Sequence, residues 1–380
     1  MRFFLKLFLV AIAYLVIVSP AFAVYDPLSV KNNKFGIHIL YAEEVTEVSS
    51  LVNTEGGDWG YVTIPIQASD RNLDKWQTFM DNCKKNHLIP IIRLATDGDY
   101  FNKTSWSVPT YNDVLSFANF LNSLNWPTKN RYIVVYNEVN RADEWGGTPD
   151  PAGYAQILDY AVQIFKARSS DFFIISAGLD NASIDIDGTS YNQFSYMRLM
   201  NYAVPGIFSE IDGLGSHAYP NPAFSSAPST SSIGIDSFYY QKNLADELAG
   251  KTLPVFITET GWSSDKVPYD TQNQYYIEAF NKYWSDKDVV AVTPFILHSD
   301  QGPFTQFAFI KNDNQTPIYA NYKNFPKVAG EPQLNPNYPA PKESSVRFPT
   351  VKFNINENIN SVFKEVNSYT KTFFKWLLKV

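Results

Sequence analysis

Two glutamates stand where a carboxylate is costly to bury, each near the end of a short apolar run. Glu138 ends the run RYIVVYNEV (131–139), and Glu259 ends the run LPVFITET (253–260). An unpaired buried carboxylate is unfavourable, so a glutamate in such a place usually marks a charge pair or a reactive group. Two carboxyl groups about 5 Å apart can cleave a glycosidic bond with retention, one as nucleophile and the other as acid and then base.

Eight short apolar runs recur along the chain and must position these side chains. They cover residues 34–40, 60–66, 88–95, 131–139, 172–179, 211–219, 253–260 and 289–297. Such runs are typical of strands in a parallel sheet that is buried on both faces. Amphipathic segments separate them, and eight alternating strand–helix units predict a single (β/α)8 barrel. The alternative, a doubly wound open sheet, usually has a glycine-rich loop after its first strand, which the segment GIHILYAEEV lacks.

In a barrel of this kind the functional site lies at the C-terminal ends of the strands. Side chains alternate along a strand, so Glu138 should share a face with Val134, and Glu259 should share a face with Ile257. Both carboxylates are therefore predicted to point into one mouth of the barrel, although they are far apart in sequence.

Composition limits the classes of function. With 380 residues, 45% hydrophobic and 18% charged, the chain can bury a large core, which argues against global disorder. A net charge of −7 disfavours a nucleic-acid partner. The aromatic content of 16% fits either core packing or a carbohydrate-binding cleft. Four scattered histidines and the absence of HExxH and CxxC motifs predict neither a metal nor a cofactor.

The two ends of the chain differ from the barrel. Residues 1–23 have the pattern of a cleaved export signal, with an uncleaved anchor as the alternative. We therefore expect a secreted or extracytoplasmic protein, either free or associated with the cell surface. The barrel should cover 24–327, followed by a Pro-rich linker at 328–349. Residues 350–380 have the spacing of a basic amphipathic helix, which can lie on a membrane or dock on protein. The single cysteine, Cys83, is expected to be a buried thiol, and the chain to be a monomer.

These motifs resemble clan A of the glycoside hydrolases, retaining (β/α)8 enzymes that include families 5 and 39, over roughly residues 34–327. In that clan an Asn-Glu pair ends strand four, as Asn137 and Glu138 do here, and a glutamate ends strand seven, as Glu259 does. The resemblance implies that Glu138 is the acid/base and Glu259 the nucleophile. It also implies that Asn137 binds the 2-hydroxyl of the sugar.

Further residues follow from the same resemblance. A His-x-Tyr motif at strand six is common in the clan, and His217 and Tyr219 match it, with the tyrosine expected to donate to the nucleophile. The chain departs from the clan in having Phe295 where many family 5 members have a strand-eight tryptophan. It also lacks the usual arginine after strand two, and Arg93 either orients Glu259 instead or forms a structural ion pair.

Several weaker candidates surround this constellation. His38 ends strand one, Trp145 follows strand four, and Trp262 is the best candidate for stacking on a sugar because it is three residues from Glu259. Asp143 and Glu144 can rival Glu138 as the acid, but they lie beyond the strand and are expected to be solvated loop residues. The leading interpretation is a secreted retaining β-glycosidase. A non-catalytic carbohydrate-binding module on the same barrel, and a protein whose C-terminal helix is the functional part, are the alternatives.

Overall fold

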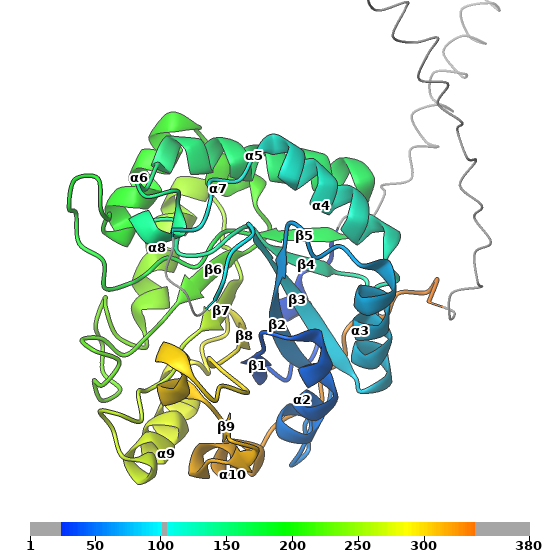
Figure 1. Ribbon diagram of the computed structural model, residues 1–380, viewed down its shortest axis with the longest axis vertical. Coiled ribbons are helices and arrows are strands. Elements are labelled where there is room, and N and C mark those ends of the chain that lie inside the picture. The colour runs from blue at the N-terminus through cyan, green and yellow to red at the C-terminus, as the bar shows by residue number, and fades with distance from the viewer. Residues whose placement is uncertain (1–23, 101–104, 339–380) are drawn as a thin grey trace, which may run out of the picture. The chain divides into compact units, whose positions relative to one another are not determined.

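The computed structural model describes residues 24–100 and 105–338, in which eight parallel strands alternate with helices (Figure 1). The eight strands are β1 (Gly36–His38), β2 (Gly60–Gln67), β3 (Leu88–Ala95), β4 (Arg131–Val134), β5 (Phe172–Ile175), β6 (Leu214–His217), β7 (Val255–Glu259) and β8 (Val289–Val292). Each of the eight apolar runs coincides with one of them, and only β2 extends beyond its run, by the single residue Gln67. A continuous apolar run suits a strand that is covered on both faces.

The strands form a ring built from two hydrogen-bonded sheets. One sheet has the order β1-β2-β3-β4-β5 and the other β6-β7-β8. Isolated parallel bridges join the sheets at both seams, one between Phe35 and Val292 and the other between Ile175 and Gly213. The fold is therefore the predicted (β/α)8 barrel, and the C-terminal ends of all eight strands meet at one mouth.

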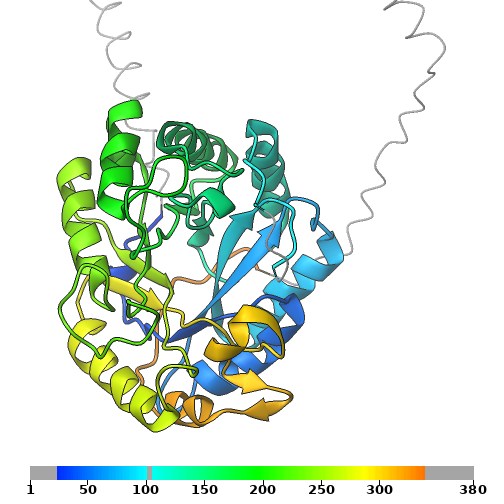
Figure 2. The ribbon, with the colours of Figure 1, turned by 60° about the vertical axis from the view of Figure 1, so that its left-hand side comes forward.

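Helices cover the outside of the ring (Figure 2). The α-helices are α2 (Val45–Val52), α3 (Leu73–Lys85), α4 (Tyr111–Ser123), α5 (Pro151–Arg168), α6 (Gln193–Ala203), α7 (Ile207–Glu210), α8 (Ser237–Ala249), α9 (Tyr269–Glu278) and α10 (Pro317–Lys323). Local sequence starts several of them: Asp150 caps α5 ahead of Pro151, and Thr110 forms a capping box with Asp113 at α4.

Shorter elements lie in the connections. They are the 3₁₀ turns η1 (Pro27–Ser29), η2 (Ala42–Glu44), η3 (Ala142–Glu144) and η5 (Gly302–Phe307), the π turn η4 (Ala279–Tyr283), and the hairpin of β9 (Ile310–Lys311) and β10 (Asn314–Gln315). Turns η2, η3 and η5 follow β1, β4 and β8, so they stand at the mouth of the barrel and can contribute side chains to it.

Apolar side chains form two layers of core. The inner layer fills the barrel, where the ring of Tyr132 lies 5.0 Å from Phe173 and 5.2 Å from Phe256. The outer layer, here called the outer core, lies between the strands and the helices and includes Ile257 and the buried thiol of Cys83. This packed interior makes the strands a rigid support for the loops at the mouth.

The segment after α10 differs from the predicted linker. Residues 328–338 run along the end of the barrel opposite the mouth, where Ala329 pairs with Asp58 and Leu334 with Thr128. Backbone pairing of this kind fixes a segment whose composition favours an extended conformation. The remainder of the predicted linker, 339–349, the predicted export signal, 1–23, and the predicted helix, 350–380, lie outside the described residues. Across 24–100 and 105–338, none of the helices has the length and hydropathy that a membrane span requires.

Candidate active site

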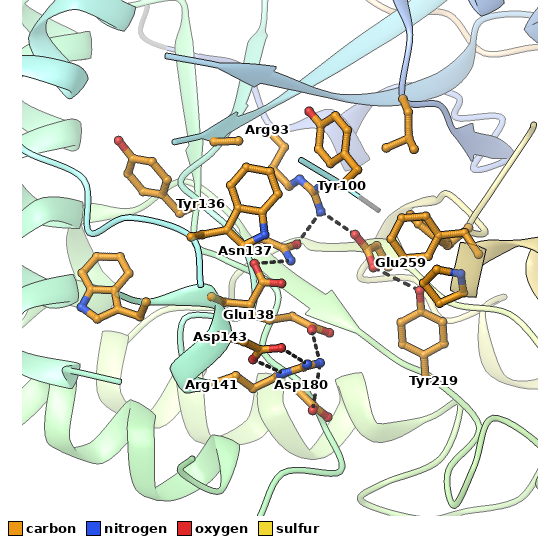
Figure 3. Close-up of a pocket in the computed structure, with 18 of the residues that line it drawn as sticks. Arg93, Tyr100, Tyr136, Asn137, Glu138, Arg141, Asp143, Asp180, Tyr219 and Glu259 are labelled. Carbon is orange, nitrogen blue, oxygen red and sulfur yellow. Dashed lines mark hydrogen bonds and ion pairs between the residues drawn. The ribbon is translucent and has the colours of Figure 1, made fainter. Parts of the chain in front are cut away.

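Glu138 and Glu259 meet at the mouth of the barrel, where both carboxylates are directed into one pocket (Figure 3). One polar atom from each glutamate and one from His217 form a cluster in which all three lie within 4.8 Å of one another. The two glutamates are 8% and 7% exposed, and His217 is 1% exposed. This approach of one oxygen from each carboxylate is closer than the separation of about 6.5–9.5 Å by which an inverting glycosidase accommodates a water molecule.

The backbone that presents Glu138 is irregular. The regular hydrogen bonding of β4 ends at Val134, and Tyr136 and Glu138 then adopt left-handed φ angles of 69° and 36°. Residues with side chains rarely adopt such angles, which cost about 1–3 kcal/mol each and concentrate at functional sites. Two backbone hydrogen bonds hold Glu138 in this conformation: its N–H donates to Gly178 at 3.0 Å, and its carbonyl accepts from Arg141 at 2.9 Å.

Glu259 reaches the mouth by a route that the alternation argument did not predict. Ile257 packs outward in the outer core, so strict alternation would turn Glu259 outward as well. The register between β6 and β7 shifts, because Ser216 pairs with Ile257 whereas the next residue, His217, pairs with Glu259. Thr258 is therefore the extra residue of a β-bulge, and the bulge turns Glu259 into the barrel mouth. The predicted position of Glu259 is right, but the predicted shared face with Ile257 is wrong.

Two side chains hold the carboxylate of Glu259 by hydrogen bonds, and a third lies just beyond hydrogen-bond distance. Arg93 Nη1 lies 2.5 Å from Oε1, and the hydroxyl of Tyr219 donates to Oε2 at 3.0 Å. His38 Nε2 lies 3.7 Å from Oε1. Arg93, from β3, thus orients Glu259. The sequence has no arginine after strand two that could do so. The same guanidinium nitrogen donates to the side-chain oxygen of Asn137 at 2.5 Å, which links the ends of β3, β4 and β7 (Figure 3).

Glu138 has a different set of partners. Arg141 Nη1 donates to Oε2 at 2.9 Å, and His217 Nδ1 lies 3.0 Å from Oε1. Arg141 is itself held by Asp143 at 2.6 Å and lies 3.7 Å from Asp180. The carboxylates of Glu138, Asp143 and Asp180 surround the guanidinium of Arg141. Arg141 is not among the residues predicted from the sequence, although its spacing of three residues from Glu138 is a usable signal.

The charges around Glu138 decide where a proton resides. Burial raises the pKa of Glu138, but the charge of Arg141 and the hydrogen bond from His217 outweigh burial and lower that pKa below its usual range. Burial lowers the pKa of His217, but the negative charges of Glu259 and Glu138 outweigh it, so that the pKa of His217 is raised. Both shifts favour the ion pair in which His217 carries the proton and Glu138 is a carboxylate.

A glycine gives His217 its place beside Glu138. A Cβ atom added to Gly178 would lie 2.1 Å from Cδ2 and 2.4 Å from Nε2 of the His217 ring, too close for any side chain. We expect Gly178→Ala to displace the ring and to lower kcat by about 10–100-fold, within the range of a lost proton-transfer partner. The measurement is steady-state kinetics on an aryl glycoside. Gly188→Ala is the steric control, because an added Cβ there meets nothing within 4 Å, although its φ of 67° adds local strain.

The pocket has a volume of about 420 Å³. Six of the predicted catalytic and substrate-binding residues line it, and the others do not. Those that line it are Arg93, Asn137, Glu138, Trp145, Tyr219 and Glu259. His38 and His217 are fully buried and do not line it, so the prediction that they bind substrate directly is corrected: both contact the carboxylates instead. Trp145 lines the pocket at 2% exposure, so little of its ring can touch a ligand.

The prediction that Trp262 stacks on a sugar is wrong. Its ring is 1% exposed and packs on the outside of the barrel against Tyr276, at a centroid distance of 4.9 Å. Its indole N–H donates to the carbonyl of Ser226 at 2.8 Å. The chain turns at Gly261, whose φ is 143°. Because of this turn, the side chain of Trp262 points away from the mouth into which Glu259 points.

Other aromatic residues form the walls of the pocket. They are Tyr100 and Trp106 after β3, Tyr136 after β4, Phe224 after β6, and Phe295, Phe304 and Phe307 after β8. Phe295 takes the place of the strand-eight tryptophan, and its ring lies 4.9 Å from that of Phe304 and 5.0 Å from that of His38. Apolar rings on both sides of the glutamates give flat surfaces on which a sugar ring can lie.

A metal ion would meet competition at this site. Glu138, His217 and Glu259 each offer a ligand atom, but Arg141 and Arg93 already donate to the two carboxylates. A divalent cation would have to displace these guanidinium groups or lie beside them. The donor set therefore suits proton transfer and carboxylate chemistry better than metal binding.

No protein-family model and no curated protein matches the chain. Solved structures do match it. One is a family 39 glycoside hydrolase from the gut symbiont Bacteroides cellulosilyticus, with a TM-score of 0.53 and 15% identity over 79% of this chain and 64% of that one. Another is a family 39 β-xylosidase from Caulobacter crescentus, with a TM-score of 0.53 and 15% identity over 80% and 72% of the two chains.

A family 5, subfamily 18 variant from Streptomyces cattleya, solved in complex with Manβ1-4GlcNAc, also matches. Its TM-score is 0.54, with 13% identity over 77% of this chain and 79% of that one. The chain thus spans less than two thirds of the first of these three proteins. At such low identity the likeness shows the fold, and the resemblance to clan A hydrolases holds at the level of the barrel.

Proposed function

We propose that this protein is a retaining β-glycosidase in which Glu259 is the nucleophile and Glu138 the acid/base. The observation that carries the proposal is the distance of at most 4.8 Å between a carboxylate oxygen of each glutamate across one pocket. Retaining enzymes have carboxyl groups about 5–5.5 Å apart, whereas inverting enzymes need about 6.5–9.5 Å. The clan A barrel and the aromatic walls of the pocket support a carbohydrate substrate.

In the first step the carboxylate of Glu259 attacks the anomeric carbon, and the bond from that carbon to the leaving oxygen breaks. The leaving oxygen takes a proton from Glu138, and Glu138 receives it from His217 Nδ1 across their 3.0 Å contact. Arg93 and Tyr219 hold Glu259 in line for the attack. The products are a glycosyl ester on Glu259 and a free alcohol.

In the second step water enters the position of the leaving group. Glu138, now a carboxylate, removes a proton from this water as its oxygen attacks the anomeric carbon and the ester bond to Glu259 breaks. The proton returns to the pair formed by Glu138 and His217, and Glu259 becomes a free carboxylate again. Two inversions at the same carbon give a product with the configuration of the substrate.

The proton held by His217 should affect the pH dependence of kcat/KM. In the wild type, the pKa of His217 is raised by the negative charges of Glu259 and Glu138, so His217 keeps the reactive proton available to a higher pH than an ordinary histidine would. In His217→Asn the proton must reside on Glu138, whose pKa Arg141 lowers. We therefore expect the alkaline limb of kcat/KM to move to lower pH and kcat to fall by about 10²–10³-fold. Rates measured from pH 4 to 9 give this limb, and an unchanged limb would show that His217 does not supply the proton.

The charge of the pocket restricts the substrate. Six carboxyl groups line it, from Asp99, Glu138, Asp143, Glu144, Asp180 and Glu259. The two lining guanidinium groups, Arg93 and Arg141, already donate to carboxylates. An anionic sugar would enter a negative field without an unpaired cation among the lining residues, so the pocket suits neutral sugars.

This field can be tested with a matched pair of substrates. An aryl β-glucuronide and the corresponding aryl β-glucoside differ only at C6. We expect kcat/KM to be at least about tenfold lower for the glucuronide at low ionic strength, because like charges repel across a partly desolvated pocket. Equal or faster turnover of the glucuronide would contradict a substrate class of neutral sugars.

The proposed function is tested by the stereochemistry of the product. The purified chain from Val24 onward is screened on aryl β-glycosides and on β-glucans, mannans, xylans and galactans, and the first-formed sugar is followed by proton NMR. We expect the β anomer to appear first, with the α anomer following only by mutarotation. An α anomer appearing first means inversion, and binding without turnover on every substrate means a non-catalytic carbohydrate-binding module.

We further propose that the protein acts outside the cytoplasm. The charged start, apolar run and Ala-Phe-Ala ending of residues 1–23 support this proposal. Deletion of residues 350–380, followed by measurement of partitioning onto anionic vesicles, tests whether that segment contributes a membrane contact.

A further inference from the structure

We infer that Glu144 is a positioning residue of this site, which fixes the amide of Asn137 so that one N–H of that amide is left for the sugar. The inference rests on the proposed function, together with the contact between Asn137 and the 2-hydroxyl of the sugar that the resemblance to clan A implies. It also reverses the sequence-based prediction that Glu144 is a solvated loop residue, since its side chain lines the pocket.

A chain of hydrogen bonds connects Glu144 to the nucleophile. The side-chain amide of Asn137 donates to Glu144 Oε2 at 3.3 Å, and its oxygen accepts from Arg93 Nη1 at 2.5 Å. The same Arg93 nitrogen donates to Glu259 at 2.5 Å. Asn137 therefore lies between a carboxylate on one side and a guanidinium on the other.

These two partners determine which way the amide of Asn137 points. Arg93 has only N–H donors, so the oxygen of the amide must face it, and the NH₂ group must face Glu144. The NH₂ group has two hydrogens, and Glu144 takes one of them. The second hydrogen remains for a ligand in the pocket. Without Glu144 the amide would still face Arg93, but it would be free to pivot about that single contact.

The backbone under Glu144 is held firmly. Glu144 is the last residue of the turn η3, and this turn accepts one backbone hydrogen bond from the loop after β3 and donates one to the loop after β5. Trp106 N–H donates to the carbonyl of Asp143 at 2.8 Å, and Ala142 N–H donates to the carbonyl of Thr189 at 2.8 Å. Trp145, the next residue, is buried. A carboxylate on such a support can orient a neighbour with little loss of entropy.

Among the described residues, no salt bridge explains why the carboxylate of Glu144 lies at the pocket. Within the described residues, no lysine, arginine or histidine lies within 4.0 Å of it. Burial, followed by the charge of Glu138, raises the pKa of Glu144 to about 7, so keeping it ionised in this pocket is unfavourable. A carboxylate that is buried where its ionised form is unfavourable, and that has no salt bridge, is a candidate for a functional role.

The experiment compares two substrates and four variants. The substrates are an aryl β-glycoside that the wild type hydrolyses and the same compound without its 2-hydroxyl. The variants are Glu144→Ala, Glu144→Gln, Asn137→Ala and the double variant Asn137→Ala/Glu144→Ala. Glu43→Ala is the matched control, because Glu43 is an exposed glutamate in the turn η2 at the same mouth and does not line the pocket.

A positioning role gives a definite pattern. Glu144→Ala should lower kcat/KM on the order of tenfold on the parent glycoside, the size of one hydrogen bond, and less than about twofold on the 2-deoxy compound. Glu144→Gln, which keeps an acceptor oxygen, should retain most of the activity. The double variant should be no slower than Asn137→Ala, because Glu144 acts through Asn137.

Two results overturn the inference while leaving the proposed function intact. One is an equal loss on both substrates in Glu144→Ala, and the other is a double variant whose loss is the product of the two single losses. If the wild type hydrolyses neither the parent glycosides nor the 2-deoxy compounds, the proposed function is wrong, and the inference that rests on it is wrong too. The two failures are therefore distinguished by the wild-type rate alone.

Discussion

Glu259→Gln should lower kcat by roughly 10⁵-fold, as the loss of a covalent nucleophile does in other enzymes. Glutamine has almost the shape of glutamate: its one oxygen can accept from Arg93, and its amide N–H can donate to the hydroxyl of Tyr219, so the pocket should keep its form. Its amide is a poor nucleophile and cannot form the glycosyl ester. Steady-state kinetics gives the loss, and calorimetric titration with the best-hydrolysed oligosaccharide should show binding that is largely unchanged.

The control for this variant is Glu331→Gln. Glu331 forms an exposed ion pair with Lys31 at the opposite end of the barrel, and such a pair contributes little to stability. We expect its activity to match that of the wild type. Turnover of Glu259→Gln within tenfold of the wild-type rate would exclude Glu259 as the nucleophile.

Glu138→Ala should have the second largest effect, and its size should depend on the leaving group. A poor leaving group, such as a second sugar, needs the proton from Glu138, so we expect a loss of about 10²–10⁴-fold in kcat/KM. A dinitrophenolate needs no proton, and its first step should be almost unaffected. Rates for a series of aryl glycosides that differ in the pKa of the phenol measure this dependence.

The series also tests Glu138 against Glu144 as the acid. In Glu138→Ala the slope of log(kcat/KM) against phenol pKa should become steeper than in the wild type, while in Glu144→Gln it should stay unchanged. The opposite pattern would assign the acid to Glu144.

Local sequence pattern was sufficient to locate the strands and both glutamates. Each strand needs only a short run of apolar residues, and a carboxylate at the end of such a run is conspicuous because it is costly to bury. The direction of Glu259 was not predictable in the same way. It depends on the bulge at Thr258, which arises from the register between β6 and β7 and has no signature in the run itself.

Tertiary packing explains the other differences. Trp262 is close to Glu259 in sequence, but the chain turns at Gly261 and the ring finds a larger apolar surface among Tyr276 and Trp284 than the pocket offers. The position of Glu144 at the pocket is not predictable from its place in a loop, because hydrogen bonds with two other loops fix the turn that carries it. The Pro-rich composition of 328–338 predicts an extended chain and does not indicate the barrel that it pairs with.

The most direct test of the central claim is the mass of a trapped intermediate. A 2-deoxy-2-fluoro β-glycoside with an activated leaving group slows both steps, the second more, so that a glycosyl-enzyme accumulates. After digestion with pepsin at low pH, we expect one fluoroglycosyl group on the peptide that contains Glu259, and none when Glu259 is replaced by glutamine. A label on Glu138 or on Glu144, or no label while the same glycoside is hydrolysed, would contradict a double displacement through Glu259.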